Sequence, residues 1–211
     1  MSEITYERIR ENLSVLNMKH TLETLDNYLE QAIHDKTNVV EILDHILTEE
    51  AGSRKQRAID SQIKMSGFPF QKTLESFDFG FQPSIDVNQV MELATMRFVE
   101  NRENLVFLGP PGVGKTHLAV ALGTIAARNR YSTYYISCHN LIAQLNKAHF
   151  ENRLAERLKT YSKYRVLIID EIGYLPMDIK GANLFFQLIR FVKIEIFGKR
   201  KETGGGIFSV V

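Results

Sequence analysis

Eight consecutive residues carry the spacing of a phosphate-binding loop, G-x-x-x-x-G-K-[ST]. They are Gly109, Pro110, Pro111, Gly112, Val113, Gly114, Lys115 and Thr116. Glycine lets the backbone bend tightly and turn successive N–H groups towards phosphate oxygens. In such a loop the lysine reaches the β- and γ-phosphates and the hydroxyl ligates Mg²⁺. The spacing therefore predicts a site for a nucleoside triphosphate.

The sequence on either side of the loop supports this prediction. The apolar run Leu105 to Leu108 precedes the loop and is predicted to be a buried parallel strand. After the loop, Leu118, Leu122 and Ile125 recur at helical spacing. The positive end of that helix adds to the field at the loop, and His117 is included among the candidate nucleotide-binding residues. A glycine and proline turn before an ordinary helix is the alternative, and the strand–loop–helix frame favours the phosphate site.

Two adjacent acids follow another apolar run. Residues 166–169 are predicted to be a parallel strand that ends in Asp170 and Glu171, 55 residues after Lys115. Open α/β sheets bind ligands at the carboxyl ends of their strands. Asp170 is suited to hold Mg²⁺ through its water shell, with Thr116 on the metal itself, and Glu171 is suited to polarise the water that attacks the γ-phosphate. With the loop, these acids predict hydrolysis of the β–γ bond of a nucleoside triphosphate, with Lys115 and Glu171 as catalytic residues.

Composition and charge are those of an ordinary globular protein. The 211 residues are 44% hydrophobic and 24% charged, with a formal net charge of +1. Residues 1–80 carry 9 Lys and Arg against 14 Asp and Glu, whereas residues 81–211 carry 17 against 11. A basic rear part is compatible with nucleic acid but does not establish it. The single cysteine, Cys138, excludes an internal disulfide and suits a reducing cytoplasm, and no apolar helix reaches the ~20 residues of a membrane span.

The rest of the chain divides by its sequence pattern. Apolar residues recur at helical spacing through the front part, where Asn38 is predicted to cap a third helix. This part has no catalytic geometry, and we interpret it as a recognition or assembly module. The family resemblance given below implies that it is the part that binds DNA or a partner. A later helix is predicted from Asp86 to Glu100. The predicted boundaries are 1–65 for the helical module, 66–85 for a connector, 86–190 for a partial P-loop ATPase core and 191–211 for an atypical tail.

Two further patterns leave DNA contacts open. Phe77, Phe79 and Phe81 alternate in the connector, where such rings either stack on single-stranded bases or pack the connector onto the core, the favoured interpretation. Basic side chains also gather in one stretch, either as a DNA-phosphate patch or as a solvated helix face. They are Arg153, Arg157, Lys159, Lys163 and Arg165.

Four segments together carry a family resemblance. They are Phe77-Asp78-Phe79, Asn104–Thr116, Leu167–Pro176 and Gly181–Ile189. They are similar to the IstB family, insertion-sequence helper ATPases of the AAA+ type that are closely similar to DnaC-type helicase loaders. The phosphate loop belongs to a very large superfamily, whereas the block from Asp170 to Pro176 is much more family-specific.

The resemblance implies an α/β P-loop fold of the AAA+ type, in which helices flank a parallel sheet and an all-α module precedes it. It implies ATP and Mg²⁺ as cofactors, DNA as a ligand, self-association, and a transposase as the partner. One alternative is a helicase loader that acts on a replicative helicase in DNA replication. Another is a non-catalytic copy that acts only through protein–protein contacts.

The C-terminal part departs from the family pattern. After the Phe185-Phe186 helix we find no sensor Asn, trans-acting Arg or helical lid, and we expect the sheet and lid to be incomplete through a frameshift near residue 190. Val192 to Phe197 alternates with charges and is expected to pair as an edge strand at most. Because a sensor and a trans-acting Arg complete the charge clamp in such sites, we expect weak ATP binding and little turnover from this polypeptide alone.

Overall fold

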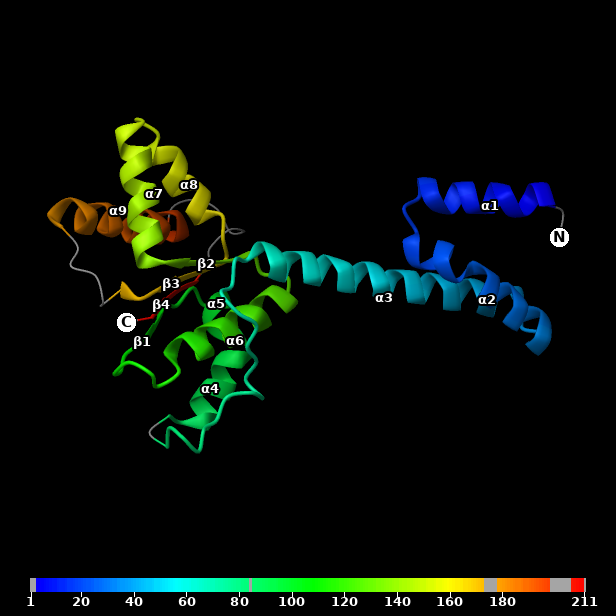
Figure 1. Cartoon of the computed structure of the whole chain (residues 1–211), viewed down its shortest axis with the longest axis horizontal. Helices are drawn as coiled ribbons and strands as arrows, with labels where there is room; N and C mark the ends of the chain where they lie inside the picture. The colour runs from blue at the N-terminus through cyan, green and yellow to red at the C-terminus, as the bar shows by residue number, and fades with distance from the viewer. Residues whose placement is uncertain (1–2, 84, 173–177, 198–205, 211) are drawn as a thin grey trace. The chain divides into compact units, whose positions relative to one another are not determined.

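A computed structural model (Figure 1) describes residues 3–83, 85–172, 178–197 and 206–210. Residues 173–177, inside the family-like block, therefore lie outside the described part. The chain forms two compact units, Met1–Asp60 and Ser61–Val211. In the described part of the chain, no helix combines the length and the apolar character that crossing a membrane requires.

The first unit is all-helical, as predicted for the N-terminal module. It contains α1 (Glu3–Val15), α2 (Lys19–Asp35) and the beginning of α3 (Val39–Met65). The side chain of Asn38 accepts a hydrogen bond from the Val40 backbone N–H at 2.9 Å, which confirms Asn38 as the residue that caps the start of α3.

A buried carboxylate, Glu50 on α3, ties α2 to α3. Its side chain is 5% exposed and accepts hydrogen bonds from the backbone N–H of Thr21 at 2.9 Å and from Arg57 at 2.9 Å. Met18, which precedes α2, provides no side-chain cap, so Glu50 supplies an acceptor that the start of α2 lacks. Burial disfavours the charged form, but these hydrogen bonds outweigh it and lower the pKa of Glu50.

The second unit is built on a parallel sheet. Its strands are β1 (Leu105–Phe107), β2 (Thr133–Ser137), β3 (Val166–Asp170) and β4 (Gly206–Val210), in the order β1-β4-β3-β2. Every neighbouring pair is parallel, so β1 and β3 end at the same edge of the sheet with β4 between them. The prediction that the strand before the loop is buried is wrong, because β1 is an outer strand of this sheet and Val106 is 56% exposed.

Helices cover both faces of this sheet, as Figure 1 shows. One layer is α4 (Val87–Ala94), α5 (Arg97–Glu100) and α6 (Lys115–Arg128); the other is α7 (Cys138–Phe150), α8 (Leu154–Ser162) and α9 (Ile179–Phe197). The side chains of β3 alternate between the two layers. Val166 and Ile168 belong to the apolar core with α6, whereas Leu167 and Ile169 belong to the core with α7, α8 and α9. This alternation fixes the strand that carries Asp170.

Two secondary-structure predictions are wrong. The helix expected from Asp86 to Glu100 is broken at Met96, whose left-handed backbone (φ 63°) separates α4 from α5. The break buries Met96 itself at 1% exposure and places Phe98 and Val99 in the core. The edge strand expected at residues 192–197 is instead the end of α9, since a short alternating run fits either period and here continues an established helix. The strand in the tail is β4, which lies inside the sheet.

The connector packs against the start of α6. Phe77 is buried, and its ring lies 5.1 Å from the ring of His117 and 4.8 Å from that of Phe79, both edge-to-face. His117 donates a hydrogen bond from Nε2 to the backbone oxygen of Thr73 at 2.9 Å. Packing onto the core is therefore confirmed for Phe77 and Phe79, while Phe81 is 71% exposed.

The buried carboxylate predicts a pH-dependent stability. We expect Glu50→Gln to lower the free energy of unfolding by about 2 kcal/mol at pH 7, because Thr21 and Arg57 then lose a charged acceptor. Since folding lowers the pKa of Glu50 below its ordinary 4.5, this contribution is complete above pH 4.5 and is lost as the pH falls through the lowered value. Urea unfolding followed by circular dichroism from pH 7 to pH 3 measures it. Glu49→Gln, on the half-exposed neighbour, is the control, and equal losses in both variants would contradict the prediction.

The connector contact predicts different costs at two loop glycines. Gly112 and Gly114 both have a left-handed backbone, with φ of 81° and 89°, so alanine at either position costs roughly 1–2 kcal/mol. A Cβ at Gly112 meets open space, whereas one at Gly114 would lie 2.5 Å from the ring of Phe77. We therefore expect Gly114→Ala to lower the thermal midpoint clearly more than Gly112→Ala, and Phe77→Leu to recover part of that loss. Equal midpoints for the two alanine variants would refute the contact.

Candidate nucleotide-binding site

The glycine loop joins β1 to α6 as the sequence predicts. Gly114 is the residue before the first turn of α6, and its left-handed backbone, like that of Gly112, is one that side-chain-bearing residues avoid. Lys115 begins the helix and donates from Nζ to the backbone oxygens of Gly109 at 2.7 Å and Pro110 at 2.9 Å. The ammonium group is thus folded over its own loop, at the positive end of a helix of 14 residues.

The two acids occupy different environments at the end of β3. Asp170 is 3% exposed, and its Oδ1 accepts the backbone N–H of Glu171 at 2.8 Å. Its Oδ2 accepts the hydroxyl of Tyr135, on the neighbouring strand β2, at 2.6 Å. Glu171 is exposed and has a left-handed backbone with φ 61°. One acid is therefore fixed by the fold, whereas the other projects at a turn next to it.

A cavity of about 350 Å³ brings the loop and the acids together. Its lining residues are Pro111, Gly112, Gly114, Lys115, Thr116, Asp170 and Glu171. A hydroxyl and a carboxylate are hard oxygen ligands, which suit Mg²⁺ bound jointly with substrate phosphates. Within the described residues, no three His, Cys, Asp or Glu side chains form a metal cluster by themselves. The side chains present fit a magnesium–phosphate group rather than a metal cage made of protein alone.

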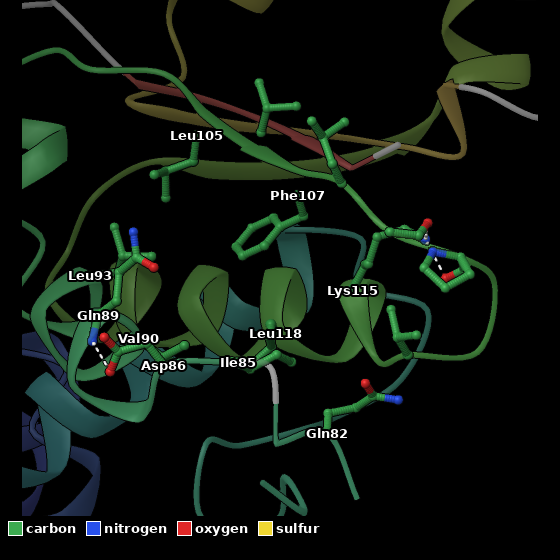
Figure 2. A pocket seen from close by; sticks show the side chains of 15 residues that line it. Gln82, Ile85, Asp86, Gln89, Val90, Leu93, Leu105, Phe107, Lys115 and Leu118 are labelled. Atoms are coloured by element: carbon green, nitrogen blue, oxygen red, sulfur yellow. Dashed lines mark hydrogen bonds between the residues drawn. The ribbon is translucent and has the colours of Figure 1, made fainter.

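A second cavity of about 440 Å³ lies between α4 and β1, and it reaches Lys115 as well. Figure 2 shows Phe107 of β1 facing Val90 of α4 across it, with Gln82 and Ile85 on a further wall. Asp86 also lines it, while its Oδ1 caps α4 by accepting the Asn88 N–H at 2.8 Å. The predicted loop residues Gly109, Pro110 and Val113 line this cavity. The loop therefore has a mainly apolar hollow on one side and an acidic one on the other.

The structure separates one predicted nucleotide-binding residue from the others. His117 lines neither cavity and bonds to Thr73 of the connector instead. The structure also adds to the site residues that the sequence did not indicate. Tyr135 lies 35 residues from the carboxylate that it bonds, and Gln82 and Ile85 precede the loop by more than 20 residues. Of these residues, only Tyr135 had a signal in the sequence, because the alternation of side chains along β2 places it on the face of the sheet that α6 covers.

Comparison with known proteins agrees with this geometry. The family described as IstB-like ATP binding protein matches residues 11–195. A protein of insertion sequence IS232 from Bacillus thuringiensis subsp. berliner, named for ATP binding, is 48% identical over 88% of this chain and 74% of its own length. A protein of insertion sequence IS21 from Pseudomonas aeruginosa, also named for ATP binding, is 48% identical over 87% of this chain and 70% of its own length.

Solved structures show the fold. AMPPCP-bound DnaA from Aquifex aeolicus is similar with a TM-score of 0.56 and 19% identity, over 68% of this chain and 43% of DnaA. DnaI gives a TM-score of 0.50 and 20% identity, over 66% of this chain and 72% of DnaI. These likenesses agree with the predicted α/β fold, in which helices cover both faces of a parallel sheet. From the family match and the two relatives, we conclude that the chain belongs to the IstB-like ATP-binding proteins of insertion sequences.

Proposed function

We propose that the chain binds ATP together with Mg²⁺ at the loop. The observation that carries this proposal is that Lys115, Thr116 and Asp170 line one and the same cavity. Lys115 would exchange the carbonyls that it now contacts for β- and γ-phosphate oxygens, and the N–H groups at the start of α6 would add to the field. Thr116 and Asp170 would hold the metal ion, which supplies charge neutralisation at the phosphates.

The cavity between α4 and β1 is the proposed place for the base. It touches Gly109, Pro110 and Lys115, so a ligand bound through its phosphates at the loop can extend into it. Its apolar wall includes Ile85 and Val90, which suits the faces of a flat ring, and the side-chain amides of Gln82 and Gln89 offer hydrogen bonds at its rim.

Hydrolysis, at the low rate expected from the sequence for this polypeptide alone, is the proposed reaction, with Glu171 as the group that orients water. Its carboxylate borders the same cavity as Lys115 and Thr116, and it is exposed, whereas Asp170 is buried and accepts two hydrogen bonds. Phosphoryl transfer of this kind needs positioning and charge stabilisation rather than a covalent intermediate. Within that scheme Glu171 accepts a proton from the attacking water, and Lys115 stabilises the charge that develops on the phosphate oxygens.

At the level of the cell, we propose a cytoplasmic DNA-binding helper that self-associates and assists the transposase of an insertion sequence. The relatives' names support the connection to insertion sequences. The excess of basic residues in 81–211 supports contact with DNA phosphates. A hollow of about 540 Å³ between α7 and α8 is bordered by Lys147, Arg153 and Arg157, but also by two glutamates that pair with the first two. We propose this hollow as one contact with the DNA backbone.

Removal of the loop lysine tests nucleotide binding. We expect Lys115→Ala to weaken ATP binding by about 100-fold or more, because an ammonium–phosphate contact contributes roughly 3 kcal/mol. Isothermal titration calorimetry with ATP and MgCl₂ on the full chain measures the change. Lys72→Ala, in the connector, is the matched control for loss of one positive charge and should bind as the wild type does. Equal ATP affinity in wild type and Lys115→Ala would exclude the loop as the nucleotide site.

Removal of the water-orienting acid tests the link between ATP and DNA. We expect Glu171→Gln to bind ATP normally, to lose hydrolysis, and so to remain longer on DNA in ATP than the wild type. Fluorescence anisotropy of a labelled DNA duplex, with phosphate release measured in parallel, gives both quantities. A DNA affinity that is identical with ATP, with ADP and without nucleotide would contradict the proposed helper role. In a pull-down from the same samples, capture of a replicative helicase instead of a transposase would replace that role with helicase loading.

A further inference from the structure

Tyr135 reaches the buried carboxylate by lying along the sheet. In the register of β2 and β3, Tyr135 is opposite Ile168, whereas Asp170 is two residues further on and opposite Ser137. Two residues of a strand span about 6.6 Å, so only a long side chain that extends towards the end of the strand closes this gap. The hydroxyl of Tyr135 does so at 2.6 Å from Oδ2 of Asp170.

The other end of Tyr135 is also held. Its backbone N–H donates to the backbone oxygen of Ser66 at 2.8 Å, and its ring packs against the core on the α6 side. Ser66 is fully buried, and both its backbone N–H and its hydroxyl bond to the last turns of α3. Tyr135 is therefore held at its backbone, at its ring and at its hydroxyl, which bonds to Asp170.

The bond constrains which way the carboxylate faces. Asp170 accepts the Glu171 N–H on Oδ1 and the Tyr135 hydroxyl on Oδ2, which together define the plane of the carboxylate. The phenol hydroxyl of Tyr135 is the donor in this bond and Asp170 is the acceptor. Each oxygen retains a lone pair for the cavity that Asp170 lines.

We propose that Tyr135 is a positioning residue that orients Asp170 for the magnesium ion of the nucleotide. This inference rests on the proposed ATP and Mg²⁺ site and adds to it a partner from β2. Groups that hydrogen-bond a metal ligand typically change metal affinity by about 10–100-fold when they are removed. Loss of the hydroxyl should therefore change the Mg²⁺ requirement and leave the Mg²⁺-independent part of nucleotide binding unchanged.

The test compares two tyrosines on the same strand. Tyr134 lies on the opposite face of β2, where its ring stacks on Tyr164 at 4.9 Å, so Tyr134→Phe is the matched control for Tyr135→Phe. The affinity of a fluorescent ATP analogue is measured in EDTA and over a MgCl₂ series. We expect Tyr135→Phe to raise the half-saturating Mg²⁺ concentration by about 10-fold with unchanged affinity in EDTA, and Tyr134→Phe to match the wild type.

A measurement without nucleotide checks the contact itself. In thermal unfolding in EDTA, Tyr135→Phe and Asp170→Ala should be non-additive, because each removes the same hydrogen bond. A wild-type chain that binds no analogue at any Mg²⁺ concentration would overturn the proposed function and this inference with it. A wild type that binds, with equal Mg²⁺ midpoints in all three proteins, would overturn only the role of Tyr135. If Tyr135→Phe does not fold, 3-fluorotyrosine is placed at residue 135 instead and followed by fluorine NMR. Its resonance should shift when Mg²⁺ is added to the protein with the bound analogue. An unchanged resonance would refute the positioning role of Tyr135.

Discussion

The parallel pairing of the sheet is the constraint on which the site depends. Because β1 and β3 run in the same direction on either side of β4, the loop after β1 and the acid that ends β3 emerge at one edge. If either strand ran in the opposite direction, Lys115 and Asp170 would lie at opposite ends of the strands. The alternating side chains of β3, which enter two different apolar cores, also fix its register, since a shift by one residue would exchange the faces.

Around that edge one acid is buried and the other exposed, which suits the different tasks proposed for them. Asp170 is buried and held by two hydrogen bonds, whereas Glu171 beside it is exposed. A metal ligand benefits from a fixed direction, and a group that accepts a proton from water benefits from access to solvent. The connector adds a further restraint through Phe77, which lies against the backbone at Gly114 and leaves no room for a side chain there. The site is thus supported from the sheet, from α6 and from the segment that precedes the core.

Local patterns predicted most of the fold and the polar half of the site. A few neighbouring residues were enough to predict the loop, Asp170, Asn38 and the strands β2 and β3. The errors arise where contacts between residues far apart in sequence determine the structure. The left-handed turn at Met96 accompanies the burial of Met96, Phe98 and Val99 in the core, which the local sequence does not reveal. The strand β4 was unexpected because its partners, β1 and β3, lie far away in sequence. Tyr135 was missed for the same reason, since a tyrosine in a strand carries no local sign of the acid that it meets.

The contacts of Lys115 have a consequence for selectivity. Its ammonium group already has two carbonyl partners in the loop. The net binding free energy of an incoming anion is therefore only the difference between its own contacts with the ammonium group and those of the two carbonyls. A single inorganic phosphate offers little improvement over this arrangement and has no means of filling the apolar hollow beside α4. The nucleotide that we propose has several linked phosphates and a ring, so it would replace the carbonyls and extend into both cavities. If the proposed site holds, the loop would discriminate against small anions, because each of them would have to displace the carbonyls of Gly109 and Pro110 from Lys115.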